Sequence, residues 1–356
     1  MTPSPRKLVI GGHSLAAGET WDLYLDLTQA YSGEDVQLPV RVVRAAKAGP
    51  TLLLTAAVHG DEINGTGVIR ELILNPPFEL ARGTLVLVPV VNIPGFERRT
   101  RYMPDRRDLN RCFPGLEDGS LSSRIAHTVF EQIVRSCDYC IDFHTAAVHR
   151  TNFPNVRGDL GNTDVRRIAE AFGASLLLDS KGLPKTLRSA ATDAGCATIV
   201  IEAGEVWKVE PAIVEFGVRG VSNVLGELEM IEWKRTHPPY RAHIDRRRWL
   251  RSDAGGMLRF HARPGDVLEQ GQPIASCLTL LGEERGTVVA PEDGIVVGST
   301  TLPAVKPGDP VCHFGSARGG IKPILAALKK VSQESLHERL RGDLGSSITL
   351  EESDPQ

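Results

Sequence analysis

Two histidines and two glutamates in this sequence are of types that bind metal ions or transfer protons. His59 and Glu62 lie in "AAVHGDEING" (56–65), His144 lies in "IDFHTA", and Glu202 lies in "TIVIEAGE". Two histidines and one carboxylate leave the fourth position of a tetrahedral zinc ion open for water, which is typical of catalytic zinc. We therefore predict that His59, Glu62 and His144 bind one Zn²⁺ per chain. Glu202 is then available as the general base for the attacking water.

Each of these residues also has a simpler interpretation when it is taken alone. A histidine after a strand is more often a hydrogen-bonded turn residue than a metal ligand, and H-x-x-E is a weak motif. A glutamate at the end of a strand can form an ordinary salt bridge. The combination favours the metal site, because all four residues follow apolar segments that have the character of buried strands.

These apolar segments indicate an α/β fold. Short runs rich in Val, Ile, Leu and Thr alternate with helix-like segments, which predicts a sheet covered on both faces. Ligands bind at the carboxyl ends of the strands in such a sheet. The predicted strands are 51–57, 84–91, 138–143, 174–178 and 197–201, and the predicted helices are 64–75, 121–136, 163–172 and a helix within 208–231.

The C-terminal third has a different composition. Residues 249–314 are rich in Gly, Val and Pro, lack a helical period, and contain Pro-Gly-Asp and Glu-Gln-Gly turns, so they predict a small all-β domain. This segment resembles the barrel-sandwich hybrid of biotinyl and lipoyl carriers, but its hairpin "LLGEERG" has no lysine to modify. We predict a hydrolase domain at 1–240, a β-rich domain at 246–316, and a terminal helix with a flexible tail at 317–356.

Composition restricts the partners and the location. The net charge is −3, with 41 % hydrophobic and 24 % charged residues, so neither nucleic acid nor an anionic membrane is expected as a partner. No apolar segment approaches the roughly 20 residues of a membrane span, and we expect a cytoplasmic protein. The six cysteines are scattered, which indicates reduced thiols. Cys137 and Cys140 form a C-x-x-C without a second ligand pair, and Cys140 is predicted to point into the core. Homo-oligomerisation is left open.

A loop at 92–115, "NIPGFERRTRYMPDRRDLNRCFPG", contains six arginines. A loop of this length is usually functional or disordered. Two interpretations stay open for Arg98, Arg99, Arg106 and Arg107. They form a solvated surface, or they recognise carboxylates, for which the guanidinium group has the best geometry.

Four motifs in order, "HGDE", "RY…RDLNRCFPG", "DFHT" and "IEAGE", resemble the succinylglutamate desuccinylase/aspartoacylase family, which belongs with the zinc carboxypeptidases. The resemblance covers roughly residues 45–235. It implies a zinc-carboxypeptidase-like mixed sheet flanked by helices, followed by a β-rich C-terminal domain. It also implies that Arg101 polarises the scissile carbonyl and that Asn110 and Arg111 bind a substrate carboxylate. The spacer "MPDRR" between "RY" and "DLNR" is longer than in aspartoacylases, which argues against aspartoacylase itself.

The resemblance implies a zinc-dependent hydrolase that cleaves the amide bond of a small-molecule N-acyl amino acid. Two alternatives stay open. The first is a carboxypeptidase-like peptidase that acts on short acidic peptides or acidic peptide tails. The second is a non-catalytic binding module, which loss of a zinc ligand or of Glu202 would mark. All of these residues are present.

Overall fold

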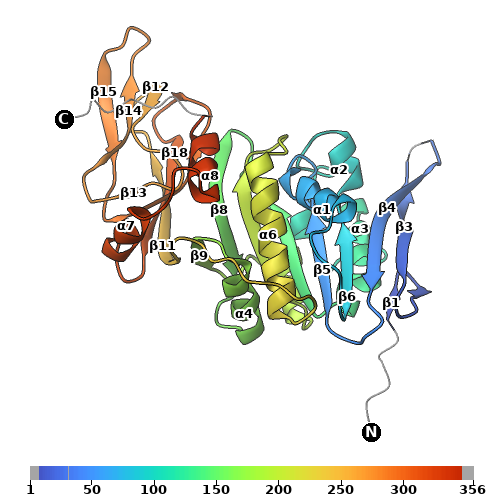
Figure 1. The fold of residues 1–356 in the computed structure, drawn as a ribbon. Coiled ribbons are helices and arrows are strands. Elements are labelled where there is room, and N and C mark those ends of the chain that lie inside the picture. Colours follow the sequence, from blue (N-terminus) through green and yellow to red (C-terminus); the bar gives the residue numbers. More distant parts are fainter. Residues whose placement is uncertain (1–7, 31, 347–356) are drawn as a thin grey trace.

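The computed structural model describes residues 8–30 and 32–346, and its core is a mixed sheet of twelve strands in the order β13-β16-β18-β11-β9-β8-β10-β7-β5-β6-β4-β3 (Figure 1). Four neighbouring strands in its middle run parallel, namely β6 (Thr84–Val88), β5 (Thr51–Ala56), β7 (Tyr139–His144) and β10 (Ala197–Gly204). Their carboxyl ends therefore meet at one edge of the sheet.

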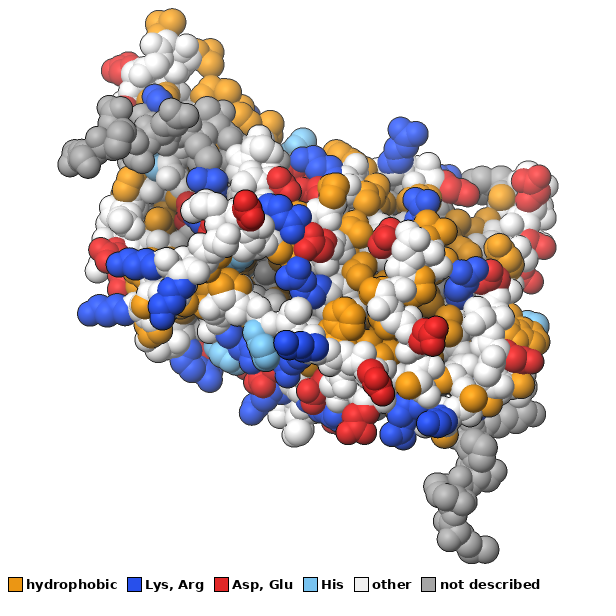
Figure 2. All heavy atoms as spheres, in the orientation of Figure 1, with side chains coloured by type: hydrophobic (Ala, Val, Ile, Leu, Met, Phe, Trp, Pro, Cys, Tyr) orange, Lys and Arg blue, Asp and Glu red, His pale blue; other side chains and the backbone are white. Residues whose placement is uncertain are grey.

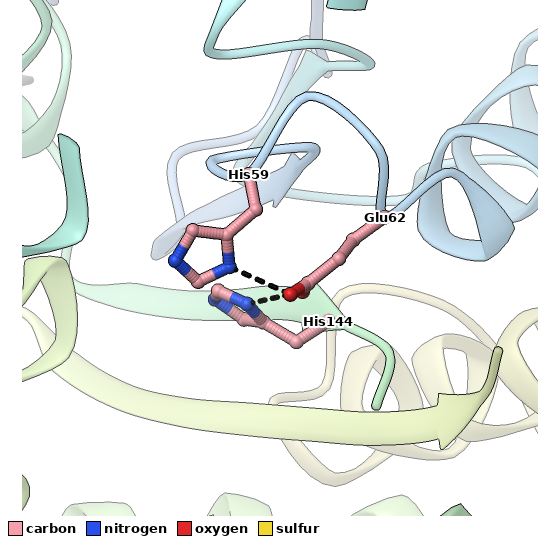
Figure 3. Close-up of side chains that lie close together, drawn as sticks. All are labelled: His59, Glu62 and His144. Atoms are coloured by element: carbon pink, nitrogen blue, oxygen red, sulfur yellow. Dashed lines mark hydrogen bonds and ion pairs between the residues drawn. The ribbon is translucent and has the colours of Figure 1, made fainter. Parts of the chain in front are cut away.

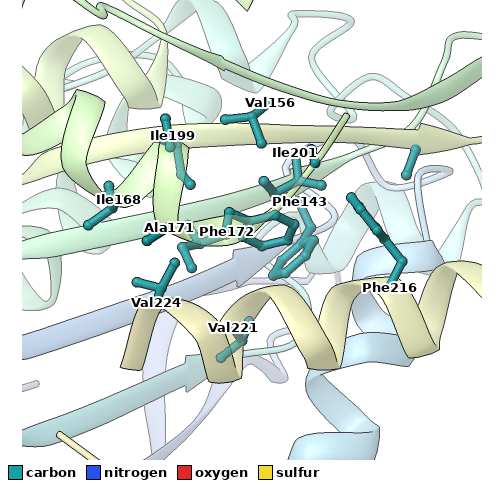
Figure 4. Close-up of a cluster of buried hydrophobic side chains, with 14 of the residues drawn as sticks. Phe143, Val156, Ile168, Ala171, Phe172, Ile199, Ile201, Phe216, Val221 and Val224 are labelled. Carbon is teal, nitrogen blue, oxygen red and sulfur yellow. The ribbon is translucent and has the colours of Figure 1, made fainter. Parts of the chain in front are cut away.

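Helices cover both faces of this sheet, which confirms the predicted α/β fold. One face packs against α1 (Asn64–Leu74), α4 (Thr163–Phe172) and α6 (Pro211–Glu227), and the other against α3 (Leu121–Gln132) and α5 (Leu187–Asp193). Successive side chains of a strand point to opposite faces, so both faces need apolar residues. In β5, Leu52 and Leu54 pack on the first face and Leu53 on the second. Figure 4 shows Phe143, Phe172 and Phe216 packed between the sheet and α6.

Most predicted elements form, with local differences at their ends. The strand predicted at 84–91 ends at Val88, because Pro89 has no backbone N–H to donate to the sheet. The helix predicted at 121–136 ends at Gln132, where Ile133 leaves helical geometry, and a separate 3₁₀ turn follows at Val134–Ser136. The prediction missed β8 (Arg150–Gly158), α5, and the antiparallel strands β3 (Thr20–Gln29) and β4 (Asp35–Arg44).

The C-terminal strands extend the central sheet. A separate four-stranded sheet contains β15 (Glu284–Val289), β14 (Pro273–Leu278), β12 (Gly256–Phe260) and β17 (Ala304–Val305). By contrast, β11 (Ala242–Arg251), β16 (Gly294–Thr300) and β18 (Pro310–Ala317) join the twelve-stranded sheet, as does β13 (Val267–Leu268). Because β16 pairs with both β18 and β8, the five strands β8, β9 (Leu176–Asp179), β11, β18 and β16 close into a barrel. The division of the chain at 240–246 stays a prediction.

Two helices follow β18, where the sequence suggested one. They are α7 (Lys322–Leu328) and α8 (Leu336–Gly345), and the hydroxyl of Ser335 accepts a hydrogen bond from the Glu338 backbone N–H to start the second helix. The predicted flexible tail falls largely on residues 347–356, which lie outside the described residues. The remaining short elements are β1 (Val9–Ile10), β2 (His13–Ser14), α2 (Ile93–Glu97) and a 3₁₀ helix at Leu109–Arg111.

The sequence predicts that Cys140 is buried in the core and that no segment spans a membrane. Cys137 and Cys140 are both buried, free thiols, and Cys140 packs in the core as predicted. Within residues 8–30 and 32–346, no helix is long and apolar enough to cross a membrane.

Candidate active site

His59, Glu62 and His144 lie at the carboxyl edge of the parallel strands. His59 follows the end of β5, Glu62 lies just before α1, and His144 is the last residue of β7. In the loop between β5 and α1, Gly60 packs directly against the backbone of Gly95 and Phe96. A Cβ atom on Gly60 would lie 2.0 Å from the carbonyl carbon of Gly95, so only glycine fits there.

These three side chains form a candidate metal centre. One ligand atom from each lies within 4.8 Å of the others, and all three residues are buried. Figure 3 shows both rings directed at the Glu62 carboxylate, with each Nδ1 2.8 Å from one of its oxygens. His59 Nδ1 is buried and has no hydrogen bond of good geometry among the described residues, as expected of a ligand nitrogen. The group could therefore hold a metal ion, and its two nitrogens and carboxylate suit zinc.

Two further carboxylates contact the Nε2 atoms of the two rings and so orient them. His59 Nε2 lies 3.1 Å from Asp108, and His144 Nε2 lies 2.8 Å from Asp142, which also accepts a hydrogen bond from Thr55. A carboxylate on the outer nitrogen is the usual partner of a metal-binding histidine, because it fixes the ring and its tautomer. Neither Asp108 nor Asp142 was predicted from the sequence as a site residue. Asp142 was detectable in principle, because it lies two residues before His144 and so on the same face of β7.

Electrostatic contacts keep the carboxylates of Glu62 and of its neighbour Asp108 ionised. Burial alone would raise the pKa of Glu62, but His59 and His144 outweigh it and hold that pKa well below its usual range. Burial likewise opposes ionisation of Asp108, yet its contacts with His59 and Arg101 lower its pKa strongly. Both carboxylates are therefore anionic at neutral pH, as a cation site requires.

Glu202 lies in β10 directly beside His144 in β7, because the two residues are paired across the parallel strands. Both of its oxygens are held. Asn152 donates a hydrogen bond to Oε2 at 3.0 Å, and Arg157 forms an ion pair with Oε1 at 3.1 Å. Both partners come from β8, a strand that was not predicted from the sequence. The carboxylate is thus fixed and points into the same cavity as the metal group.

The loop residues Arg101, Asn110 and Arg111 also reach this cavity. Arg101 binds Glu62 at 2.9 Å and Asp108 at 3.2 Å. Asn110 is buried and accepts a hydrogen bond from the Leu187 backbone, whereas Arg111 is exposed and donates to the Asn110 carbonyl. All seven predicted site residues thus line one cavity of about 500 Å³. The other four arginines of the loop are exposed and do not line it, in agreement with a solvated surface; they are Arg98, Arg99, Arg106 and Arg107.

A buried His-Glu-His group at the carboxyl edge of a mixed α/β sheet defines a candidate metal centre in a substrate-sized cavity. Residues 48–228 match the succinylglutamate desuccinylase/aspartoacylase catalytic domain. The chain therefore belongs to that family, as its motifs predict.

Several known proteins are similar over most of the chain. The N-alpha-acetyl-L-2,4-diaminobutyric acid deacetylase of Halomonas elongata is 29 % identical, covering 78 % of this chain and 84 % of that protein. A solved succinylglutamate desuccinylase/aspartoacylase from Rhodobacter sphaeroides has 27 % identity and a TM-score of 0.71, covering 84 % of this chain and 95 % of the other. The product-bound ectoine utilization protein EutE of Ruegeria pomeroyi, at 23 % identity and a TM-score of 0.72, shares the fold, covering 83 % and 94 % of the two chains.

Proposed function

We propose that this protein is a zinc-dependent hydrolase that cleaves the amide bond of an N-acyl amino acid. The observation that carries the proposal is the convergence in one cavity of the buried His59–Glu62–His144 group and a fixed carboxylate, Glu202. Family membership and the names of the similar proteins, which include a deacetylase, support the reaction type. A non-catalytic module has no need for such an arrangement.

His59, Glu62 and His144 would hold the zinc ion, which when bound lowers the pKa of a coordinated water toward ~7 and polarises a carbonyl. Glu202 accepts the proton of the attacking water and returns it to the leaving nitrogen. Asn152 and Arg157 keep its carboxylate in place during both transfers. A base that is held in this way does not need to reorganise as the reaction proceeds.

The loop residues would handle the rest of the substrate. Arg101 has a guanidinium in the cavity beside Glu62 and is suited to stabilise the oxyanion that forms at the scissile carbonyl. Arg111, exposed at the cavity, and Asn110 would bind the carboxylate of the leaving amino acid. Arginine suits this role because its planar group can donate two parallel hydrogen bonds to a carboxylate.

The proposal also includes the domain organisation and the location of the protein. We propose that residues 1–240 form a zinc-carboxypeptidase-like hydrolase domain, and that 246–316 form a β-rich domain with barrel-sandwich-like character that helps to enclose the active site. Trp249 and His313, from β11 and β18, line the cavity and support this role. We also propose a cytoplasmic location. The oligomeric state stays open.

A substrate screen tests the proposal. The zinc-loaded protein is incubated with N-acyl amino acids and with short acidic peptides, and mass spectrometry follows the products. We expect release of free amino acid from one class of N-acyl amino acid. Cleavage of the peptides alone would instead support a carboxypeptidase-like activity, and no cleavage of any compound by protein with a full zinc content would contradict the hydrolase.

A further inference from the structure

Trp207 lies in the loop 205–210, "EVWKVE", which joins β10 to α6. Its side chain is 53 % exposed and does not line the active-site cavity. Its backbone N–H donates to the carbonyl of Asp61 at 2.8 Å, and its indole Nε1 donates to the carbonyl of Arg99 at 3.1 Å. This residue is therefore attached to two other segments of the chain that lie far from it in the sequence.

Both hydrogen bonds lead to residues of the candidate site. The residue that accepts from the backbone of Trp207 directly precedes Glu62, a member of the candidate metal group. The residue that accepts from the indole lies two positions before Arg101, whose guanidinium binds Glu62 at 2.9 Å. Trp207 itself follows Glu202 by five positions. It therefore joins the segments that carry a candidate metal ligand, the proposed oxyanion donor and the proposed base.

The backbone is strained at both ends of the indole hydrogen bond. Trp207 has a φ of 58° and Arg99 has a φ of 54°, in the left-handed region that bulky side chains rarely adopt. Residues in such conformations persist only where the surrounding structure holds them, and they cluster at functional sites. Glycine would adopt the same φ without strain. The indole of Trp207 therefore contributes something that the local backbone preference does not explain.

The two segments that Trp207 joins are also in direct contact with each other. Gly60, in the loop of the metal group, packs against the backbone of Gly95 and Phe96. Trp207 lines a small hollow in the surface together with Ile63 and Phe96. The indole thus covers the outer side of this contact, and its hydrogen bond fixes the chain that leads on to Arg101.

We propose that Trp207 is a positioning residue that holds Arg101 in place relative to the metal group, through the carbonyl of Arg99. This inference rests on the proposed amide hydrolysis, in which Arg101 stabilises the oxyanion at the scissile carbonyl. Such stabilisation requires a donor that is already in place before the reaction begins. A displacement of about 1 Å can cost roughly a hundredfold in rate. Trp207 contacts neither the substrate nor the metal in this proposal, and it acts only through the loop that it holds.

Substitutions of Trp207 separate positioning from stability. Trp207→Phe retains an aromatic ring but has no N–H for the Arg99 carbonyl, and Trp207→Gly also removes the backbone strain. We expect kcat with the best N-acyl substrate to fall by roughly two- to tenfold in Trp207→Phe, the range of one hydrogen bond, and further in Trp207→Gly. KM should change by less than about twofold, because the residues proposed to bind the substrate carboxylate are untouched.

Thermal melts of the same preparations complete this comparison. Trp207→Gly should remain folded, because the strain that it relieves offsets the lost contacts of a half-exposed ring. Lower kcat in a variant that melts close to the native protein is not explained by stability, and it would support positioning. Native kcat in both folded variants would refute the proposal.

A double-mutant cycle shows whether Trp207 acts through Arg101. Arg101→Lys retains the charge and removes the planar donors. In this background Trp207→Phe should lower kcat by less than about twofold more, because the donor that it positions is already lost. Fully additive losses would contradict the proposal. Arg98→Gln is the control in the same loop, since its exposed side chain does not line the cavity, and an equal loss of kcat there would also contradict it.

Hydrogen–deuterium exchange separates this proposal from the proposed function, because it needs no turnover. Native and Trp207→Phe proteins are compared by mass spectrometry of peptides that cover residues 92–115. We expect faster exchange there in the variant, where the Arg99 N–H bonds to the Phe96 carbonyl at 3.0 Å, and unchanged exchange in β3 at the far edge of the sheet. Unchanged exchange in 92–115 would overturn the positioning role even if amides are hydrolysed. Faster exchange in a protein that hydrolyses no N-acyl amino acid would support that role and reject the reaction.

Discussion

Replacing Glu202 by Gln removes the proposed base while it retains the shape of the side chain. The amide oxygen of Gln can still accept the hydrogen bond from Asn152, which is 3.0 Å from Glu202 Oε2. The ion pair with Arg157 is lost, and because the two side chains are mostly buried, at 16 % and 23 % exposure, we expect the loss to cost about 1–3 kcal/mol of stability. We therefore expect the variant to fold and to retain its zinc.

Turnover should fall in this variant by roughly 10²–10⁴, the usual contribution of a positioned general base. This range corresponds to about 3–5 kcal/mol of activation free energy, and a thermal melt measures any loss of stability separately. The assay is amino acid release from the best N-acyl substrate of the screen. Elemental analysis of zinc and a thermal melt of the same preparation accompany it.

Glu205 offers a matched control within the same "EAGE" motif. It is buried and pairs with Lys208 at 3.0 Å, but it does not line the cavity. Glu205→Gln should therefore leave turnover close to that of the native protein. Near-normal turnover in Glu202→Gln together with a large loss in Glu205→Gln would refute the assignment and identify Glu205 as the base.

Four further outcomes are expected. His59→Ala should fold but lose the single zinc ion, and full retention of tightly bound zinc by elemental analysis would remove His59 from the site. Asp142→Asn should weaken zinc affinity by roughly ten- to a hundredfold, measured by chelator competition, because it weakens the bond that orients His144; an unchanged affinity would contradict that role. Amidation of the leaving amino acid's carboxylate should lower kcat/KM by roughly ten- to a hundredfold. The Arg111→Lys variant should show much of the same loss in kcat/KM with the free acid. Equal kcat/KM values for the acid and the amide in the native protein would rule out carboxylate recognition. Intact mass should equal the chain mass, and an added biotin or lipoyl mass on a lysine would contradict the interpretation of "LLGEERG".

The candidate metal group was predictable from sequence because its position follows from local rules. Continuous apolar runs predict strands that are buried on both faces, and residues that follow such strands share the carboxyl edge of a parallel sheet. His59, Glu62 and His144 each obey this rule, and the structure brings their ligand atoms within 4.8 Å. Glu202 obeys it as well, since β10 pairs with β7 and sets it beside His144.

The residues that hold these side chains were not predictable in the same way. Asn152 and Arg157 lie in β8, a strand in which polar and apolar residues mix, so its sequence did not indicate a buried strand. Asp108 lies in a long loop, where spacing carries little information on contacts. Its bonds to His59 and Arg101 depend on how that loop folds back over the sheet.

The residues that line the cavity also divide into those placed by neighbouring parallel strands and those placed by the pairing of distant strands. The proposed reaction depends above all on His59, Glu62, His144 and Glu202, whose positions are set by the neighbouring parallel strands β5, β7 and β10. The lining of the cavity also depends on β11 pairing with β9, which brings Arg247 from beyond residue 240 into the same cavity wall as Arg157 on β8. Closure of the barrel through β16 and β8 fixes that arrangement, and it joins strands about 150 residues apart in the chain. The four motifs therefore do not determine which side chains of the C-terminal strands line the cavity with Glu202, because those side chains depend on strand pairing far along the chain.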